Sequence, residues 1–306
     1  MILLIKCKYL FYALLFYSCF SFSQITIKGI VKDKETKQPL AYANIGLKLS
    51  KEGAISNEKG EFLIETKSQI KNDTLIISYL GYKSIQLPIT SQIEFKEFLM
   101  TPANLELDAV VLDNYIYKKK VKLGLDVVHN KLEYNFNNYQ KGNEIGRRIE
   151  VETPILIEKI DLFIKENTFT SIKVRLNFYE LNKYRQPTER IELDQPIIVD
   201  INKKGKFTID VSDYNLKIDH HFLITFEAID KVGEGQFTLQ GEYSFSKTKN
   251  QMLKEMVEQG IDIKDEKYIS TPFNSGCYIR QHNQDNWVVN EPHTVAIKVH
   301  AREAEF

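Results

Sequence analysis

Residues 25–33 read ITIKGIVKD, and this stretch decides the fold of the first part of the chain. From Ile25 onward, apolar and polar side chains alternate, which is the period of a β-strand with one buried face. Val31 closes the alternating run, and the polar segment 32–36 follows as a turn. The sequence therefore predicts a first strand that ends near Asp33.

Short strand patterns separated by turns continue from this point. Residues 41–49 (AYANIGLKL) begin a second strand, and the nearly continuous apolar run 75–79 (LIISY) indicates a strand that is covered on both faces. Between them, residues 57–60 (NEKG) form a turn cluster in which Gly60 supplies a positive φ. The absence of a helical period favours a small β-sandwich or barrel.

Four motifs follow one another in residues 24–112. They are Ile27-x-Gly29-x-Val31-x-Asp33, Thr36-x-x-Pro39-Leu40-x-x-Ala43-Asn44-Ile45, Asn57-x-x-Gly60-x-Phe62, and Leu75-x-x-Ser78-Tyr79-Leu80-Gly81-Tyr82. Together they resemble the carboxypeptidase-regulatory-like domain. The resemblance implies a transthyretin-like β-sandwich, found beside metallopeptidases and at the N-terminus of TonB-dependent outer-membrane receptors, with no catalytic residues of its own. One departure is Ser56-Asn57, where the family usually has Thr-Asp.

The first 23 residues have the composition of a secretory signal peptide. Lys6 and Lys8 precede an uncharged run from Tyr9 to Phe20, and small residues follow. The run is too short for a membrane-spanning helix, which needs about 20 apolar residues. We expect cleavage after Ser23 and export to the periplasm, the outer membrane or the exterior, with no transmembrane span in the mature chain.

Two alternatives concern the cysteines. Cys19 is a candidate lipidation site, although the residues before it are bulky. If cleavage instead follows Ser23, Cys277 is the only cysteine left in the mature chain, so that no intramolecular disulfide can form. We interpret Cys277 as a small packing residue rather than a nucleophile.

Composition excludes several classes of protein. Of 306 residues, 43% are hydrophobic, as is ordinary for a globular chain. The 41 basic side chains balance 41 acidic ones, so no strong field attracts nucleic acid or an anionic membrane. We expect no nucleic-acid partner.

After a connecting segment (113–140), residues 141–306 predict a second β-sandwich. The strand patterns recur every 10–15 residues, mostly without helical crossovers, and favour a jelly-roll-like antiparallel arrangement. The exception is 249–259 (KNQMLKEMVEQ), where apolar residues share one helical face, so we expect a short inserted helix. The fold class predicted for the whole chain is all-β.

The sequence contains no motif that identifies an active site. Nucleophile elbow, zinc-protease and phosphate-binding loop patterns are missing, and we predict no catalytic residues, metal or cofactor. His220 and His221 are adjacent and would face opposite sides of a strand, which argues against a shared metal. A Cys277–His282 catalytic pair stays an alternative without geometric support.

Residues 278–290 (YIRQHNQDNWVVN) are the one candidate binding region. Tyr278, Arg280, Asn283 and Trp287 combine aromatic rings with planar polar groups, which is the chemistry that stacks on a sugar. The structural alternative is that Trp287 anchors a core or a hairpin.

Three functions follow as hypotheses. The leading one is an exported or envelope-associated, non-enzymatic binding or scaffolding protein whose partner is an envelope protein or polysaccharide. The alternatives are a glycan-binding module that uses the Trp287 loop and an uncharacterised hydrolase.

Overall fold

A computed structural model describes residues 25–50, 52–66, 70, 72–89, 95–103, 115–124, 133–135, 141–193, 195–243, 277–280, 286–290 and 293–305. Within these segments, the one helix is the single 3-10 turn η1 (Ser212–Tyr214), and all other elements are strands. The predicted all-β class is therefore confirmed. Among the residues that the structure describes, no helix is long and apolar enough to cross a membrane.

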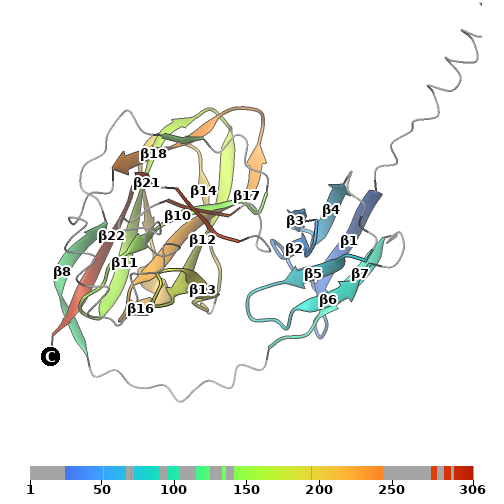
Figure 1. Cartoon of the computed structure of the whole chain (residues 1–306), viewed down its shortest axis with the longest axis horizontal. Helices are drawn as coiled ribbons and strands as arrows, with labels where there is room; N and C mark the ends of the chain where they lie inside the picture. The colour runs from blue at the N-terminus through green and yellow to red at the C-terminus, as the bar shows by residue number, and fades with distance from the viewer. Residues whose placement is uncertain are drawn as a thin grey trace, which may run out of the picture.

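The first domain is a sandwich of two sheets (Figure 1). One sheet has the order β4-β1-β7 and the other β3-β2-β5-β6. The pairs are antiparallel except β1–β7, which is parallel. The strands are β1 (Ile25–Asp33), β2 (Asn44–Leu47), β3 (Gly53–Ile55), β4 (Glu61–Thr66), β5 (Thr74–Ser78), β6 (Ile85–Pro88) and β7 (Lys96–Met100).

The motif residues of this domain hold its turns together. Asp33 Oδ1 accepts hydrogen bonds from the N–H groups of Glu35 and Thr36, both at 2.7 Å, and closes the turn after β1. Tyr82 donates its hydroxyl to Asp33 Oδ2 at 2.6 Å, which joins the first motif to the fourth. Gly60 has φ +77°, and a Cβ there would lie 2.4 Å from the carbonyl oxygen of Val31, so only glycine fits.

The second domain consists of two larger sheets around one core (Figure 1). One contains β13-β12-β17-β10-β19-β20 in that order, with β14 also paired to β12. The other contains β21-β18-β11-β22-β8, with β15 and β16 paired to β11 and β9 paired to β18. The strands are β8 (Ile116–Gly124), β9 (Glu133–Asn135), β10 (Glu144–Ile149), β11 (Ile155–Asn167), β12 (Ser171–Leu181), β13 (Pro187–Arg190), β14 (Ile197–Ile201), β15 (Gly205–Asp210), β16 (Lys217–Ile218), β17 (Phe222–Val232), β18 (Phe237–Tyr243), β19 (Cys277–Arg280), β20 (Val288–Asn290), β21 (His293–Val295) and β22 (Ile297–Glu305).

Strand alternation in β12 separates the core of the second domain from its site. Val174, Leu176 and Phe178 point inward and are at most 1% exposed. The residues between them, Arg175 and Asn177, point to the other face of the same sheet, where they are also buried. The first domain contacts this outer face through hydrogen bonds to Lys173 and Arg175 of β12.

The structure differs from expectation in two places. The segment 113–140, which the sequence presents as a connection, supplies β8 and β9, which pair with β22 and β18. Its lysine-rich pattern hides the strand because β8 lies at a sheet edge with mostly exposed side chains. The second difference is β7, a strand that the sequence pattern does not predict. The expected closing strand 105–112 and inserted helix 249–259 lie outside the described residues.

Candidate functional site

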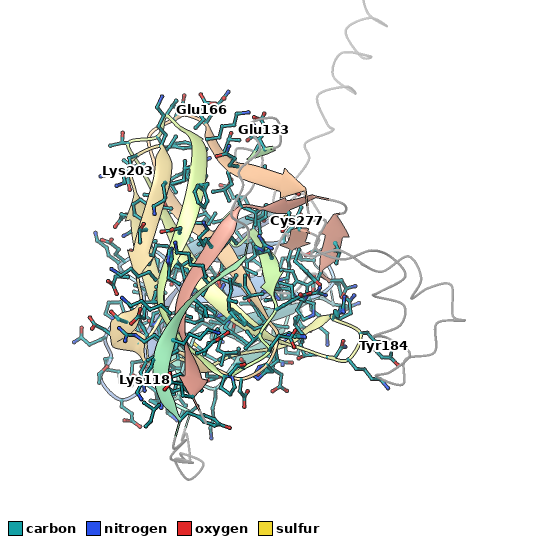
Figure 2. All side chains as sticks on the ribbon, turned by 90° about the vertical axis from the view of Figure 1, so that its left-hand side faces the viewer. Lys118, Glu133, Glu166, Tyr184, Lys203 and Cys277 are labelled. Atoms are coloured by element: carbon teal, nitrogen blue, oxygen red, sulfur yellow. The ribbon has the colours of Figure 1, made fainter. Side chains whose placement is uncertain are left out.

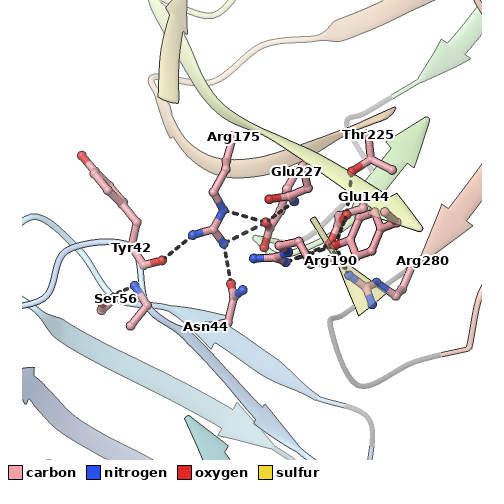
Figure 3. Close-up of polar contacts among 12 residues, drawn as sticks. Tyr42, Asn44, Ser56, Glu144, Arg175, Arg190, Thr225, Glu227 and Arg280 are labelled. Atoms are coloured by element: carbon pink, nitrogen blue, oxygen red, sulfur yellow. Dashed lines mark hydrogen bonds and ion pairs between the residues drawn. The ribbon is translucent and has the colours of Figure 1, made fainter. Parts of the chain in front are cut away.

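The two domains are joined by one buried arginine. Arg175 of β12 donates a hydrogen bond from Nη1 to the carbonyl oxygen of Tyr42 at 2.8 Å and one from Nη2 to Asn44 Oδ1 at 2.7 Å (Figure 3). Its Nε donates to Glu227 Oε2 on β17 at 2.9 Å. All five N–H groups of a guanidinium lie in one plane, so this side chain can contact two domains at once.

The loop that receives Arg175 is held in place by its own domain. Tyr42 has φ +65°, which is unfavourable for a residue with a Cβ. The buried hydroxyl of Ser56 donates to the carbonyl oxygen of Leu40 and accepts the N–H of Ala43, both at 2.8 Å. Ser56 therefore fixes the loop on both sides of Tyr42, whose carbonyl oxygen accepts the hydrogen bond from Arg175.

A second contact lies at the rim of this joint. Lys173 Nζ donates to the Tyr42 hydroxyl at 2.6 Å and to Glu58 Oε1 at 2.9 Å, and it lies 5.0 Å from the centre of the Tyr42 ring. Hydrogen bonds to Tyr42 and then Glu58 raise the pKa of Lys173. Glu58 is largely exposed, so water screens this pair and the buried Arg175 contributes more to the joint.

A fully buried carboxylate lies farther along the same sheet face. Glu144 on β10 accepts hydrogen bonds from the hydroxyl of Tyr179 at 2.9 Å and of Thr225 at 2.7 Å, and it is paired with Arg280. Burial raises the pKa of Glu144, but the positive charges of Arg280 and Arg190, with the hydrogen bonds from Arg280 and Thr225, outweigh burial and lower it to about 2. The carboxylate is therefore ionised and cannot act as a general acid near neutral pH.

Aromatic rings surround the arginines of this cluster. The guanidinium of Arg280 lies 4.3 Å from the centre of the Trp287 ring, and the Trp287 and Tyr179 rings meet edge to face at 5.2 Å. Burial raises the pKa of Tyr179 to about 12, so its hydroxyl stays protonated and donates to Glu144. Arg190 adds a hydrogen bond to the Tyr179 hydroxyl at 3.1 Å.

A hollow of about 280 Å³ lies between the domains and is lined in part by these arginine and tyrosine side chains. We call it the interdomain cleft. Both domains contribute to its walls. The lining residues are Asn44, Ser78, Tyr79, Leu80, Tyr82, Ser84, Arg175, Tyr179, Arg190, Glu192 and Arg280. Three arginines and three tyrosines therefore converge here from three separate parts of the sequence, 79–82, 175–190 and 280.

The residues that the sequence suggested as binding, lipidation or reactive sites do not lie together in one place. Arg280 lines the cleft, whereas Trp287 is half-buried against Arg280 and Tyr179 and is not among the lining residues. Tyr278 is fully buried, and its hydroxyl donates to the carbonyl oxygen of Arg185 at 3.0 Å. Asn283 and the lipidation candidate Cys19 lie outside the described residues. Cys277 is completely buried in the core, where burial raises its pKa to about 12 (Figure 2).

Apart from Arg280, sequence analysis did not assign the residues around the cleft to a site. Arg175 and Tyr179 occupy alternate positions of a strand, and that pattern usually indicates a solvent-facing side. Glu144 lies in a polar stretch, GNEIGRR, that reads as a turn. The sequence signal that could have identified them is Tyr179, an aromatic residue on the same face of β12 as the charged Lys173 and Arg175. Among the residues that the structure describes, no three His, Cys, Asp or Glu side chains are grouped to hold a metal ion.

Comparison with known proteins supports the motifs of the first domain. Residues 27–112 match the family model described as the CarboxypepD_reg-like domain. The TonB-dependent receptor SusC of Bacteroides thetaiotaomicron is 34% identical over 97 residues. That alignment spans 32% of this chain but 9% of the receptor, so the similarity concerns a small part of that protein.

Similarity to solved structures is weak. The structures of the Gt and Gx strains of infectious bursal disease virus align over 92% of this chain and over 65% and 64% of the viral chains. The sequence identities are 9% and 8%, and the TM-scores are 0.22 and 0.20, so the alignments carry no argument about fold or function. The match of residues 27–112 to the CarboxypepD_reg-like domain agrees with the four motifs of this part of the chain.

Proposed function

We propose that the chain is an exported, envelope-associated, non-enzymatic binding or scaffolding protein whose ligand or partner binds at the interdomain cleft. The observation that carries the proposal is the convergence of both domains on one polar hollow. Arg175 and Asn44, one from each domain, line it and are hydrogen-bonded to each other at 2.7 Å. The signal-like leader and the similarity of the first domain to part of an outer-membrane receptor support the envelope location.

The chemistry of the cleft favours a ligand rich in hydrogen-bond acceptors. Its arginines supply donors and no acceptors, and their charges are balanced by Glu144 and Glu227 behind the wall and by Glu192, which lines it. The wall thus offers oriented donors without a large excess of positive charge. Carboxylate and hydroxyl groups of an acidic polysaccharide, or the carbonyl groups of an extended peptide, match such donors.

Arg190 is the side chain on which to test this proposal. It lines the cleft and is about one-quarter exposed, while Arg280 would still pair with Glu144 after its removal. We expect Arg190→Ala to fold and to bind an acidic polysaccharide such as polygalacturonate at least about tenfold more weakly than wild type, because a charge-assisted hydrogen bond is lost. Trp287 fluorescence reports binding, since its ring contacts Arg280.

Arg302→Ala is the matched control. Arg302 is 38% exposed and pairs with Glu158 on the other sheet, away from the cleft. Equal weakening by both variants, or no saturable binding of any envelope polysaccharide or peptide to wild type, would contradict the proposal. Fractionation of cells that express the tagged protein tests its location, and recovery outside the envelope and the medium would count against that part.

A glycan-binding role is the second candidate. The observation in its favour is that Tyr79, Tyr82 and Tyr179 all line the cleft, so the aromatic surface available to a sugar is there rather than at Trp287. Binding of neutral polysaccharides that Tyr79→Ala abolishes and Trp287→Ala leaves intact would favour this candidate. A hydrolase stays a hypothesis, since Ser78 and Ser84 line the cleft without a histidine among the described lining residues.

A further inference from the structure

A second buried arginine has donors that the protein does not use. Arg148 on β10 is 1% exposed, and its Nη2 pairs with Glu150 at 2.7 Å. Its Nε and Nη1 are also buried, and neither has a hydrogen-bond partner in the part of the chain that the structure describes. A buried cation with unsatisfied N–H groups is costly and in native proteins usually has a bound ion, a water or a functional reason.

Arg148 lines a separate hollow of about 220 Å³, which we call the Arg148 pocket. The other lining residues are Leu181, Asn182, Lys183, Arg185, His220 and His221. They come from the hairpin between β12 and β13 and from the turn before β17. Figure 2 shows Tyr184 at the projecting tip of this hairpin.

The Arg148 pocket is distinct from the interdomain cleft. No lining residue is common to the two. Leu223 lies between them, because it pairs in register with Arg148 on one side and with Tyr179 on the other. Leu223, Tyr179 and Tyr278 form a buried apolar cluster of their own on this face of the sheet. Ligand binding at the Arg148 pocket is therefore independent of the function proposed for the cleft.

The walls of the Arg148 pocket are basic. Arg148, Lys183 and Arg185 carry positive charge, and none of the lining residues that the structure describes is a carboxylate. The nearby acids already have partners: Glu150 pairs with Arg148, while Glu180 and Asp219 lie 2.7 Å from the two ring nitrogens of His220. Three basic side chains therefore line one hollow, and one of them has buried N–H groups without a hydrogen-bond partner.

His220 and His221 line this pocket together, contrary to the expectation that they face opposite ways. They precede β17 in an irregular turn, so strand alternation does not apply to them. His221 Nδ1 accepts the N–H of Val151 at 3.0 Å, which places the proton of the neutral ring on Nε2. Burial is the main cause that lowers the pKa of His221 and favours this neutral form.

The hairpin wall has a fixed shape. Asn182 Oδ1 accepts the N–H groups of Tyr184 and Gln186 at 2.9 and 3.0 Å and closes the turn. Arg185 has φ +62°, and its carbonyl oxygen receives the hydroxyl of the buried Tyr278. These hydrogen bonds offset the unfavourable backbone conformation of Arg185 and hold Lys183 and Arg185 beside the pocket.

We propose that the Arg148 pocket binds a phosphate or sulfate group, either free or carried by a larger envelope molecule. A tetrahedral, doubly charged oxyanion supplies acceptors to the unused Arg148 donors and is attracted by the positive charges of Lys183 and Arg185. The volume exceeds that of the anion alone, so the group can enter as one end of a larger ligand. Sequence signals for this site are weak, because its basic residues are distributed over β10, one hairpin and one turn.

Calorimetric titration of the full mature chain with inorganic phosphate and with sulfate, at constant ionic strength in chloride, tests the proposal. We expect saturable binding by wild type. Arg148→Gln and the double variant Lys183→Gln/Arg185→Gln should each bind at least about tenfold more weakly, the effect of losing one charge-assisted hydrogen bond. The double variant alters side chains at the hairpin, so it retains the fold even if Arg148→Gln does not.

The matched control is Lys203→Gln/Lys204→Gln, which removes two charges from the exposed turn between β14 and β15. It should bind like wild type. Absence of saturable binding by wild type, or equal weakening in the control and hairpin variants, would overturn the proposal. Competition between inorganic phosphate and a phosphorylated or sulfated glycan then distinguishes a free anion from a group carried by a larger ligand. If the glycan displaces phosphate and binds more tightly than phosphate, the pocket binds a carried group. If phosphate binds as tightly as the glycan, the ligand is the free ion.

Discussion

Arg175 donates a hydrogen bond to the backbone carbonyl of Tyr42, 133 positions away in the sequence, at 2.8 Å. Tyr42 is held at φ +65° to present that carbonyl. The acceptor is a main-chain atom, so the contact depends on the conformation of the loop and not on the identity of the side chain there. Asn44, the neighbour two residues on, supplies the second acceptor and is part of the second family motif.

Arg175→Ala should destabilise the protein strongly. The substitution removes the two hydrogen bonds that Arg175 donates to Tyr42 and Asn44 of the first domain. It also leaves the fully buried Glu227 without its cationic partner. Breaking a buried ion pair in this way costs about 3–5 kcal/mol. Urea denaturation measures the loss, and small-angle scattering should show an increased radius of gyration. Lys173→Ala, which disrupts the exposed Glu58 contact, is the control and should change both quantities little; similar losses in the two variants would refute the role of burial.

Glu144 should make stability depend on pH in the acid range. Its folded-state pKa is lowered from 4.5 to about 2, so it contributes stability that is fully present above pH 4.5 and is lost as the pH falls toward 2. Glu144→Gln should therefore flatten the pH dependence of the free energy of unfolding between these values and lower stability at pH 7, where Arg280 loses its counter-charge. An unchanged slope in the variant would show that Glu144 is not the group responsible.

Gly146→Ala should disrupt the sheet that carries the cleft. A Cβ at this position would lie 2.0 Å from the carbonyl oxygen of Ile224, in the paired backbone of β17. We expect a loss of about 3 kcal/mol or more in thermal or urea unfolding. Gly205→Ala is the comparison: Gly205 has φ +90° with open space around it, so backbone strain of about 1–2 kcal/mol is its only cost. A smaller loss at Gly146 than at Gly205 would contradict the close packing of β10 on β17.

Cys277 should not react in the native protein. In a chain that starts at Gln24 it is the only cysteine, and it is buried with a pKa raised to about 12. Because the thiolate is the reactive form, a thiol reagent at pH 8 should label it only after addition of denaturant. Rapid stoichiometric labelling under native conditions would show that the thiol is accessible and would reopen the question of its chemistry.

The sequence by itself determined the all-β class and the similarity of residues 27–112 to the CarboxypepD_reg-like domain. Strand alternation and turn chemistry are local properties, and motifs such as the Gly60 turn have local steric causes that can be read from a few residues. The same reasoning placed Arg280 and Trp287 in one candidate binding region with Tyr278 and Asn283, since all four lie close together in the chain.

Only the tertiary structure decided where the site is. The cleft unites Asn44, Arg175 and Arg280, and the Arg148 pocket unites β10 with a hairpin and a turn. A polar strand face has the same alternation whether it meets water or another domain, because the period of two reports only that one face differs from the other. What covers that face, and so which arginines are buried and which donors remain unused, follows from the packing of segments that are remote in sequence.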